Sequence, residues 1–186
     1  FMNTKSANVS DPWFANLPSL LPDLETLYTD IHAHPELSTQ ETRTADLAAT
    51  HLRQAGFEVT TGVGGTGVVG LLRNGGGPTV MLRADMDALP VAEATGLPYA
   101  SKVTAKDKDG HTVPVMHACG HDMHVTWLIG ATTLLAQARE HWRGTVMAVF
   151  QPAEETGTGA QGMIGDGLVE RFPNPDIILG QHVMVG

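Results

Sequence analysis

The sequence has 186 residues, of which 42% are hydrophobic, so it is long enough to bury the core of one domain or of one incomplete larger domain. Its 11 basic and 20 acidic residues give a formal net charge of -9, which excludes the basic surface that nucleic acid requires and favours a small-molecule substrate. No apolar run approaches the roughly 20 residues that cross a bilayer, so we expect no membrane-spanning segment.

The N-terminus lacks the charged region and the apolar stretch of a secretory signal, which favours a cytoplasmic protein. Phe1 ahead of Met2 is typical of a residue left by cloning, and we assign residues 1–16 to an N-terminal tail. The first predicted helix begins at Leu17, from which apolar residues recur at three- and four-residue spacing, and Pro35 marks its end.

A second predicted helix follows directly along the chain. Ser38 and Glu41 have the spacing of a capping box at its start, and Gly56 stops it. Apolar runs bounded by turn residues then predict strands over 57–63, 67–72 and 79–82. The polar residues 100–116 indicate a loop or hairpin whose charged tip, 106–110, is assigned no chemistry.

The second half of the chain continues the alternation of helices and strands. A long helix is predicted over 121–142, followed by a strand over 145–150 that is apolar on both faces. A short helix over 159–169 and a last buried strand over 176–180 complete the pattern. Such alternation predicts an α/β domain with helices on both faces of its sheet, and sites in these domains form beyond the strand ends.

Polar side chains follow three of the predicted strands. Asp85 and Asp87 come after the strand over 79–82, Glu154 and Glu155 follow the strand over 145–150, and His182 follows the last strand. We therefore expect these side chains to share one cleft. Taken alone, the aspartates also suit a turn or a helix cap, the glutamates a solvated acidic turn, and the histidine an ordinary structural position.

The one cysteine of the sequence, Cys119, cannot form a disulfide within the chain and lies in the densest group of potential ligands. Cys119 and His121 can place sulfur and nitrogen on one divalent ion, because Gly120 lets the backbone turn tightly between them. The alternative is a buried thiol beside a hydrogen-bonded histidine. We assign His117 and His124 to packing or to support of the ligands, because an ion with four ligands does not use every histidine nearby.

The adjacent glutamates come directly after an apolar strand, which favours a pair held at the end of a core element over a solvated turn. One carboxylate of such a pair can coordinate an ion while its neighbour accepts a proton from water. We assign structural roles to the remaining histidines, His32, His34, His51, His111 and His141.

Five motifs occur in order along the chain: His-Pro-Glu-Leu at 34–37, Arg-Ala-Asp-Met-Asp-Ala-Leu-Pro at 83–90, His-Ala-Cys-Gly-His-Asp at 117–122, Gln-Pro-Ala-Glu-Glu at 151–155 and Gln-His at 181–182. Together they resemble the aminoacylase/carboxypeptidase-type metallohydrolases, in the branch of hippurate hydrolase, N-acyl-amino-acid amidohydrolases and indole-acetyl-amino-acid hydrolases. The resemblance implies a zinc-exopeptidase-like α/β sheet that is flanked by helices on both faces.

The resemblance also implies a site with two divalent metal ions, held by Cys119 as the bridging ligand and by His121, Glu155 and His182. Glu154 corresponds to the general base and Asp87 to the carboxylate behind the ligands. Related carboxypeptidases have a histidine ligand where Asp85 stands and an aspartate where Cys119 stands. The ions are therefore left open among zinc, manganese, cobalt and nickel.

Members of this family are longer, with a lid or dimerisation domain and a returning C-terminal segment that supplies another histidine ligand. Residues 17–186 accordingly correspond to the N-terminal part of a catalytic domain, which we expect to be incomplete. The resemblance implies hydrolysis of N-acyl or N-aroyl amino acids by a protein that is a homodimer at full length. The alternatives are a metallo-dipeptidase or carboxypeptidase, a catalytically incompetent metal-binding fragment, and an enzyme with Cys119 as its nucleophile.

Overall fold

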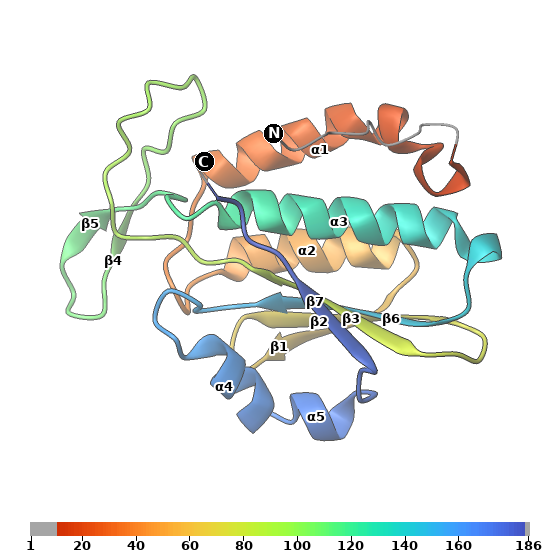
Figure 1. Ribbon diagram of the computed structural model, residues 1–186. Coiled ribbons are helices and arrows are strands. Elements are labelled where there is room, and N and C mark those ends of the chain that lie inside the picture. The colour runs from red at the N-terminus through yellow and green to blue at the C-terminus, as the bar shows by residue number, and fades with distance from the viewer. Residues whose placement is uncertain (1–10, 185–186) are drawn as a thin grey trace.

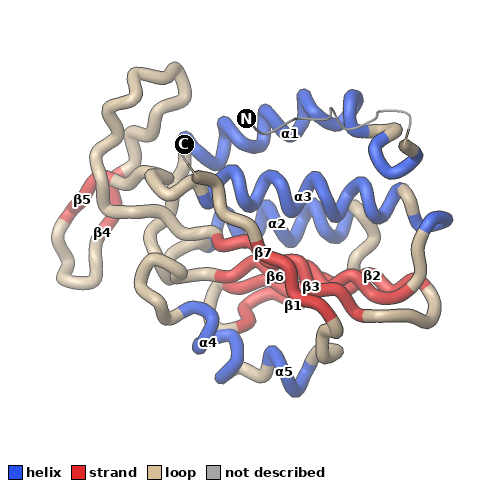
Figure 2. Tube along the Cα trace, viewed as in Figure 1, coloured by secondary structure: helices blue, strands red, loops and turns tan. Residues whose placement is uncertain are grey.

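A five-stranded sheet organises residues 11–184, the part of the chain that this computed structural model describes (Figures 1 and 2). Its strands are β1 (Glu58–Val63), β2 (Gly67–Asn74), β3 (Thr79–Asp85), β6 (Gly144–Gln151) and β7 (Ile177–Gly180), in the order β1-β2-β6-β3-β7. The pairs β1–β2 and β2–β6 are antiparallel, whereas β6–β3 and β3–β7 are parallel. Every predicted strand is therefore present, with ends that differ by a few residues.

Helices cover both faces of the sheet, as the sequence predicts (Figure 1). One layer contains α1 (Leu17–Ala33), α2 (Thr42–Gln54) and α3 (His121–Gln137), and the other contains α4 (Gly159–Gly165) and α5 (Leu168–Arg171). The predicted hairpin is formed by β4 (Thr104–Lys106) and β5 (Thr112–Pro114). Short 3-10 helices occupy Pro12–Phe14 and Arg139–His141, so the long helix ends earlier than predicted. The expected cloning residue, Phe1, lies outside the described residues.

The position of β6 at the centre of the sheet, between two layers of helices, explains why its sequence is apolar on both faces. On one face Phe150 packs with Leu52 of α2 and Ile129 of α3, in a core cluster of buried side chains. On the other face Met147 packs with Met163 of α4. Full burial of one such side chain contributes roughly 1.5–3 kcal/mol, so both helix layers are held to the sheet through this strand.

The capping box predicted for the second helix is wrong. Helix α2 begins at Thr42, after both residues of the proposed box, and the Ser38 hydroxyl instead donates to Asp87 Oδ2 at 2.6 Å. The cap is Glu36, whose two carboxylate oxygens accept from the backbone amides of residues 43 and 44 at 2.9 and 2.8 Å. A carboxylate from the preceding turn therefore accepts from the first free amides of the helix. The Ser38 hydroxyl is not needed as a cap and instead contacts Asp87, which follows β3.

The last strand is exposed rather than buried, contrary to the prediction from its apolar sequence. Ile177, Ile178 and Leu179 are 50%, 63% and 54% exposed. The reason is its position, because β7 stands at the sheet edge and pairs only with β3 within residues 11–184. A run of apolar residues indicates a strand, but it does not indicate what covers the strand.

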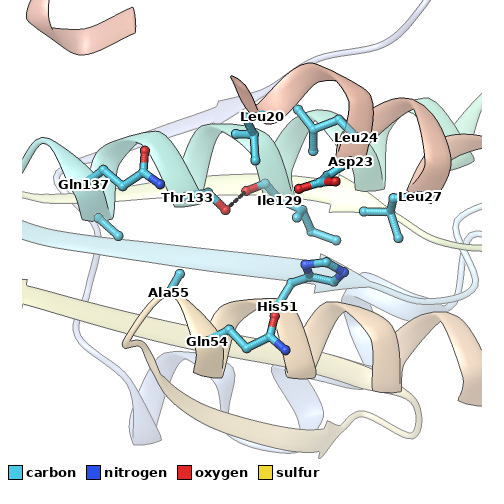
Figure 3. A pocket seen from close by; sticks show the side chains of 11 residues that line it. Leu20, Asp23, Leu24, Leu27, His51, Gln54, Ala55, Ile129, Thr133 and Gln137 are labelled. Carbon is cyan, nitrogen blue, oxygen red and sulfur yellow. Dashed lines mark hydrogen bonds between the residues drawn. The ribbon is translucent and has the colours of Figure 1, made fainter. Parts of the chain in front are cut away.

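The three helices of the larger layer leave a cavity of about 370 Å³ between them (Figure 3). Leu20 and Leu24 of α1 face His51 of α2 and Ile129 of α3 across this space. Burial lowers the pKa of His51 against the opposing charge of Asp23. No residue of this cavity belongs to the five motifs. Within the described part of the chain, no helix combines the length and apolarity that crossing a membrane requires.

Candidate metal centre

The parallel strands bring the predicted site residues to one edge of the sheet. Asp85, the last residue of β3, pairs in register with Gln151, the last residue of β6, and Arg83 pairs with Gly180 of β7. The segments after these strands therefore emerge together, opposite the N-terminus of α3. The shared cleft expected from the sequence has this origin.

His121 lies at the middle of the cluster as the first residue of α3, and it is fully buried. Its Nδ1 donates to the backbone carbonyl of Asp87 at 2.8 Å, which leaves Nε2 directed at other groups. Nε2 lies 3.8 Å from Glu154 Oε2 and 3.9 Å from Glu155 Oε1. These separations exceed hydrogen-bonding distance, so the imidazole nitrogen and the two carboxylates face a common point without bonding to one another.

Cys119 and His182 also lie close to His121, with one ligand atom of each within 4.8 Å of the others. The distance from Cys119 Sγ to His182 Nε2 is 3.3 Å, and His182 Nδ1 donates to the carbonyl of Val183 at 2.6 Å. Gly120 has a φ of 85°, and a Cβ on it would overlap the Val183 side chain. Glycine is thus required for the approach of the Val183 segment to the turn that precedes α3.

Asp87 holds the backbone of the adjacent glutamates. Its Oδ1 accepts from Glu154 N and its Oδ2 from Glu155 N, both at 3.0 Å, while Ser38 donates to Oδ2. Burial raises the pKa of Asp87, but hydrogen bonds from His121, from Ser38 and from the two amides outweigh it, so the pKa lies below its ordinary value. Asp87 is therefore a carboxylate that fixes the orientation of the glutamate pair and of His121.

Asp85 and His124 support the His182 segment. Asp85 Oδ1 pairs with His124 Nδ1 at 2.6 Å, and Asp85 Oδ2 accepts from Arg83 at 2.8 Å. Burial raises the pKa of Asp85, but His124, the charge of His121 and Arg83 together lower it to about 2. His124 Nε2 then accepts from Val183 N at 2.8 Å, so His124 links β3 to the residues after β7.

Glu41 is a residue of the site that sequence reasoning missed. It is fully buried, and its Oε1 accepts from Ala153 N at 2.8 Å and from Thr39 N at 2.9 Å, while Thr66 donates to Oε2 at 2.6 Å. Ala153 has a φ of 49°, an uncommon conformation for alanine. The carboxylate therefore holds the strained turn that aims Glu154 into the cluster. The sequence pattern assigns Glu41 to a helix cap instead, and no local spacing indicates its contact with Ala153.

A buried charge network lies behind the α3 N-terminus and was also missed. His32 Nδ1 pairs with Asp122 Oδ2 at 2.6 Å, and His32 Nε2 pairs with Glu93 Oε1 at 3.0 Å. Burial lowers the pKa of His32, but the hydrogen bonds to Glu93 and Asp122 outweigh it and raise the pKa above its ordinary value. The network joins α1, the loop after β3 and α3, and so fixes the helix end that carries His121.

The donor set fits divalent metal ions. Ligand atoms of Cys119, His121 and His182 lie within 4.8 Å of one another, as do those of His121, Glu154 and Glu155. His121 Nε2 and Glu155 Oε1 are buried and have no hydrogen-bond partner among the described residues. Two ligands at about 2 Å from a tetrahedral ion lie roughly 3.4 Å apart, close to the separations observed here. A cation would satisfy both buried atoms at once.

The environment of Cys119 opposes its use as a nucleophile. Burial raises the pKa of the thiol to about 11, and the negative charges of Glu155, Glu154 and Asp85 act in the same direction. An activated cysteine instead has a lowered pKa, with a cation or a helix N-terminus to stabilise the thiolate. The sulfur is therefore suited to a site in which a cation balances the surrounding carboxylates.

Comparison with known proteins agrees with this geometry. Residues 81–186 match the model of peptidase family M20/M25/M40. The chain is 45% identical over 163 residues to hippurate hydrolase from Campylobacter jejuni, covering 87% of this chain and 39% of that protein. It is 46% identical over 157 residues to thermostable carboxypeptidase 1 from Saccharolobus solfataricus, covering 82% and 37%. The chain thus spans about two fifths of the length of these relatives.

Solved structures extend the similarity to three dimensions. A dinuclear metal-binding peptidase of the M20 family from Bacillus subtilis superposes with a TM-score of 0.77 at 37% identity, over 89% of this chain and 43% of that one. Its sheet and helices therefore correspond to those that bring the candidate ligands together here. On the matched model, the relatives and the shared architecture, this chain belongs to peptidase family M20/M25/M40.

Proposed function

We propose that the complete protein is a metal-dependent amidohydrolase that cleaves the amide bond of N-acyl or N-aroyl amino acids. The observation that carries the proposal is that sulfur, imidazole and carboxylate ligand atoms gather around His121, and that His121 Nε2 and Glu155 Oε1 are buried without a hydrogen-bond partner among the described residues. Its relative hippurate hydrolase is named for a substrate of this class. The proposal also includes a homodimer, as the family resemblance implies, which sedimentation of the complete protein would test.

Two divalent ions are proposed to bind to Cys119, His121, Glu155 and His182. Such ions supply Lewis acidity, which polarises a carbonyl group and lowers the pKa of a coordinated water to roughly 7. Their identity among zinc, manganese, cobalt and nickel is a question for elemental analysis, because sulfur, nitrogen and oxygen donors suit all of these ions.

The adjacent glutamates differ in a way that supports separate roles. The side chain of Glu155 is 18% exposed, and one of its oxygens is buried with no hydrogen-bond partner in residues 11–184, which suits a ligand. The side chain of Glu154 is 41% exposed, so it can reach water and substrate. In the proposed reaction Glu154 accepts a proton from the attacking water and delivers it to the departing amine. A positioned acid-base group contributes about 100- to 10,000-fold to the rate.

Matched substitutions of the two glutamates test these roles in the complete protein. Glu154→Gln is expected to lose about 100- to 10,000-fold in kcat on N-benzoylglycine while the metal content stays the same. Glu155→Gln is expected to lose metal content first, measured by elemental analysis after dialysis. Near-normal turnover by Glu154→Gln would remove Glu154 from the mechanism, and full metal content in Glu155→Gln would remove that residue from the ligand set.

A carboxypeptidase or dipeptidase is the second candidate, and the likeness to thermostable carboxypeptidase 1 favours it. The two candidates share the same site chemistry and differ in the substrate. A panel of N-benzoyl amino acids, N-acetyl amino acids and free dipeptides, compared by kcat/KM, separates them. A preference for dipeptides would replace the first proposal by the second.

A further inference from the structure

A second feature of the site is a cavity of about 590 Å³ that adjoins Cys119 and His182. It extends from these candidate ligands toward the C-terminal half of α1 and the first turn of α3, with Tyr28, Met123 and Val183 in its walls. Its volume is within the range of cavities that hold small organic ligands. A group attached to a carbonyl at the ligand cluster can therefore enter it.

His117 is the one lining residue with an unexplained polar group. It is 4% exposed, and neither Nδ1 nor Nε2 has a hydrogen-bond partner among the described residues. A neutral imidazole offers one N–H donor and one nitrogen acceptor. Leaving both unpaired in the interior is costly, which points to a partner that arrives with a ligand.

The charged residues that line the cavity disfavour binding of the substrate carboxylate inside it. Asp122 lines the cavity, and His32, which also lines it, is already paired through both ring nitrogens with Asp122 and Glu93. No lysine or arginine occurs among the described residues of the lining. A substrate carboxylate placed at this end of the cavity would face Asp122 and would find no lysine or arginine side chain in the described lining to pair with. The neutral acyl side of the substrate has no such conflict.

We propose that this cavity receives the acyl group of the substrate and that His117 hydrogen-bonds a polar atom on that group. The inference rests on the proposed function and deepens it. The preferred acyl group is neutral and aromatic, because the Tyr28 ring and the Met123 thioether provide apolar walls for a flat group. It also carries one hydroxyl or N–H, which is the partner for His117. A site with a buried polar group rejects an analogue that lacks its partner.

Selectivity of the complete, metal-loaded protein tests the proposal. The ratio of kcat/KM for N-(hydroxybenzoyl)glycine, with the hydroxyl at each ring position in turn, to that for N-benzoylglycine is measured on each variant. We expect the wild-type protein to favour one hydroxylated isomer by about tenfold, the worth of one hydrogen bond. His117→Phe is expected to reduce the ratio to about one, and His117→Gln to retain part of it. The ratio is independent of the folded fraction, because both substrates meet the same preparation.

The matched control is His51→Phe, a half-buried histidine of the helical cavity in Figure 3, which is expected to leave the ratio unchanged. Wild-type protein without a preference, or a preference that survives in His117→Phe, would overturn the proposal. Calorimetric binding of neutral hydroxybenzamide and benzamide gives the same comparison without turnover. Absence of hydrolysis with selective amide binding that depends on His117 would contradict the proposed function alone. Absence of amide binding would instead show that the cavity does not receive an aromatic acyl group, and would overturn the inference.

Discussion

Replacing Glu41 by alanine tests how the turn before the adjacent glutamates is held. The carboxylate accepts three hydrogen bonds, from Ala153 N, Thr39 N and Thr66 Oγ1. Because Ala153 is buried, its N–H loses its partner in the variant, which costs about 1–3 kcal/mol. The space left by the side chain adds a cavity cost, while relief of carboxylate desolvation offsets part of the loss. We expect the free energy of unfolding to fall by about 3 kcal/mol.

Urea unfolding, followed by tryptophan fluorescence, measures this loss, and two further variants give the comparison. Glu41→Gln keeps a carbonyl oxygen for the amide of Ala153 and is expected to cost about 1 kcal/mol. Glu58→Gln removes a carboxylate from the exposed pair with Arg73 and is expected to change stability by less than about 1 kcal/mol. If Glu41→Ala unfolded at the same urea concentration as the wild type, the role assigned to this carboxylate would be wrong.

Two other variants probe the fold. Since the folded pKa of His32 lies above its ordinary value of 6.5, its ion pairs stabilise fully below that pH and are lost as the pH rises through the folded pKa. His32→Gln should abolish this dependence in urea unfolding across pH, and an unchanged pH profile would contradict it. Gly159→Ala is expected to lower the melting temperature strongly, because a Cβ would overlap the carbonyl oxygen of Pro152, whereas Gly165→Ala meets no atom within 4 Å. Equal melting of these two glycine variants would refute the steric reasoning.

The sequence was sufficient for the elements and for the convergence of the site, but not for the contacts behind it. Strands were readable because apolar runs ended at turn residues, and the parallel order placed Asp85, Glu154 and His182 at one edge. The partners of Glu41 lie 25 and 112 positions away along the chain, at Thr66 and Ala153. No local spacing encodes such pairs, and the local signal of a capping box pointed elsewhere.

The roles of the histidines also depend on contacts between residues that lie far apart in the sequence. His32 occupies a helical position and is assigned a structural role from the sequence, and His124 is assigned to packing or to support of the ligands, but neither assignment names a partner. Their carboxylate partners come from separate elements, Glu93 from the loop after β3 and Asp85 from β3 itself. A clue for His124 was available in its three-residue spacing from His121, which places both rings on one helix face. Nothing comparable in the sequence links His32 to its two acids.

The exposed edge of β7 has a consequence for the behaviour of these 186 residues in solution. Its backbone amides and carbonyls on the side away from β3 form a ready template for another strand, and Ile178, 63% exposed, offers it an apolar surface. Natural sheets blunt such edges with charge, proline or a covering element. At high concentration, self-association is therefore expected to begin at β7. Ile178→Lys should delay it, measured by light scattering, without changing the candidate metal ligands.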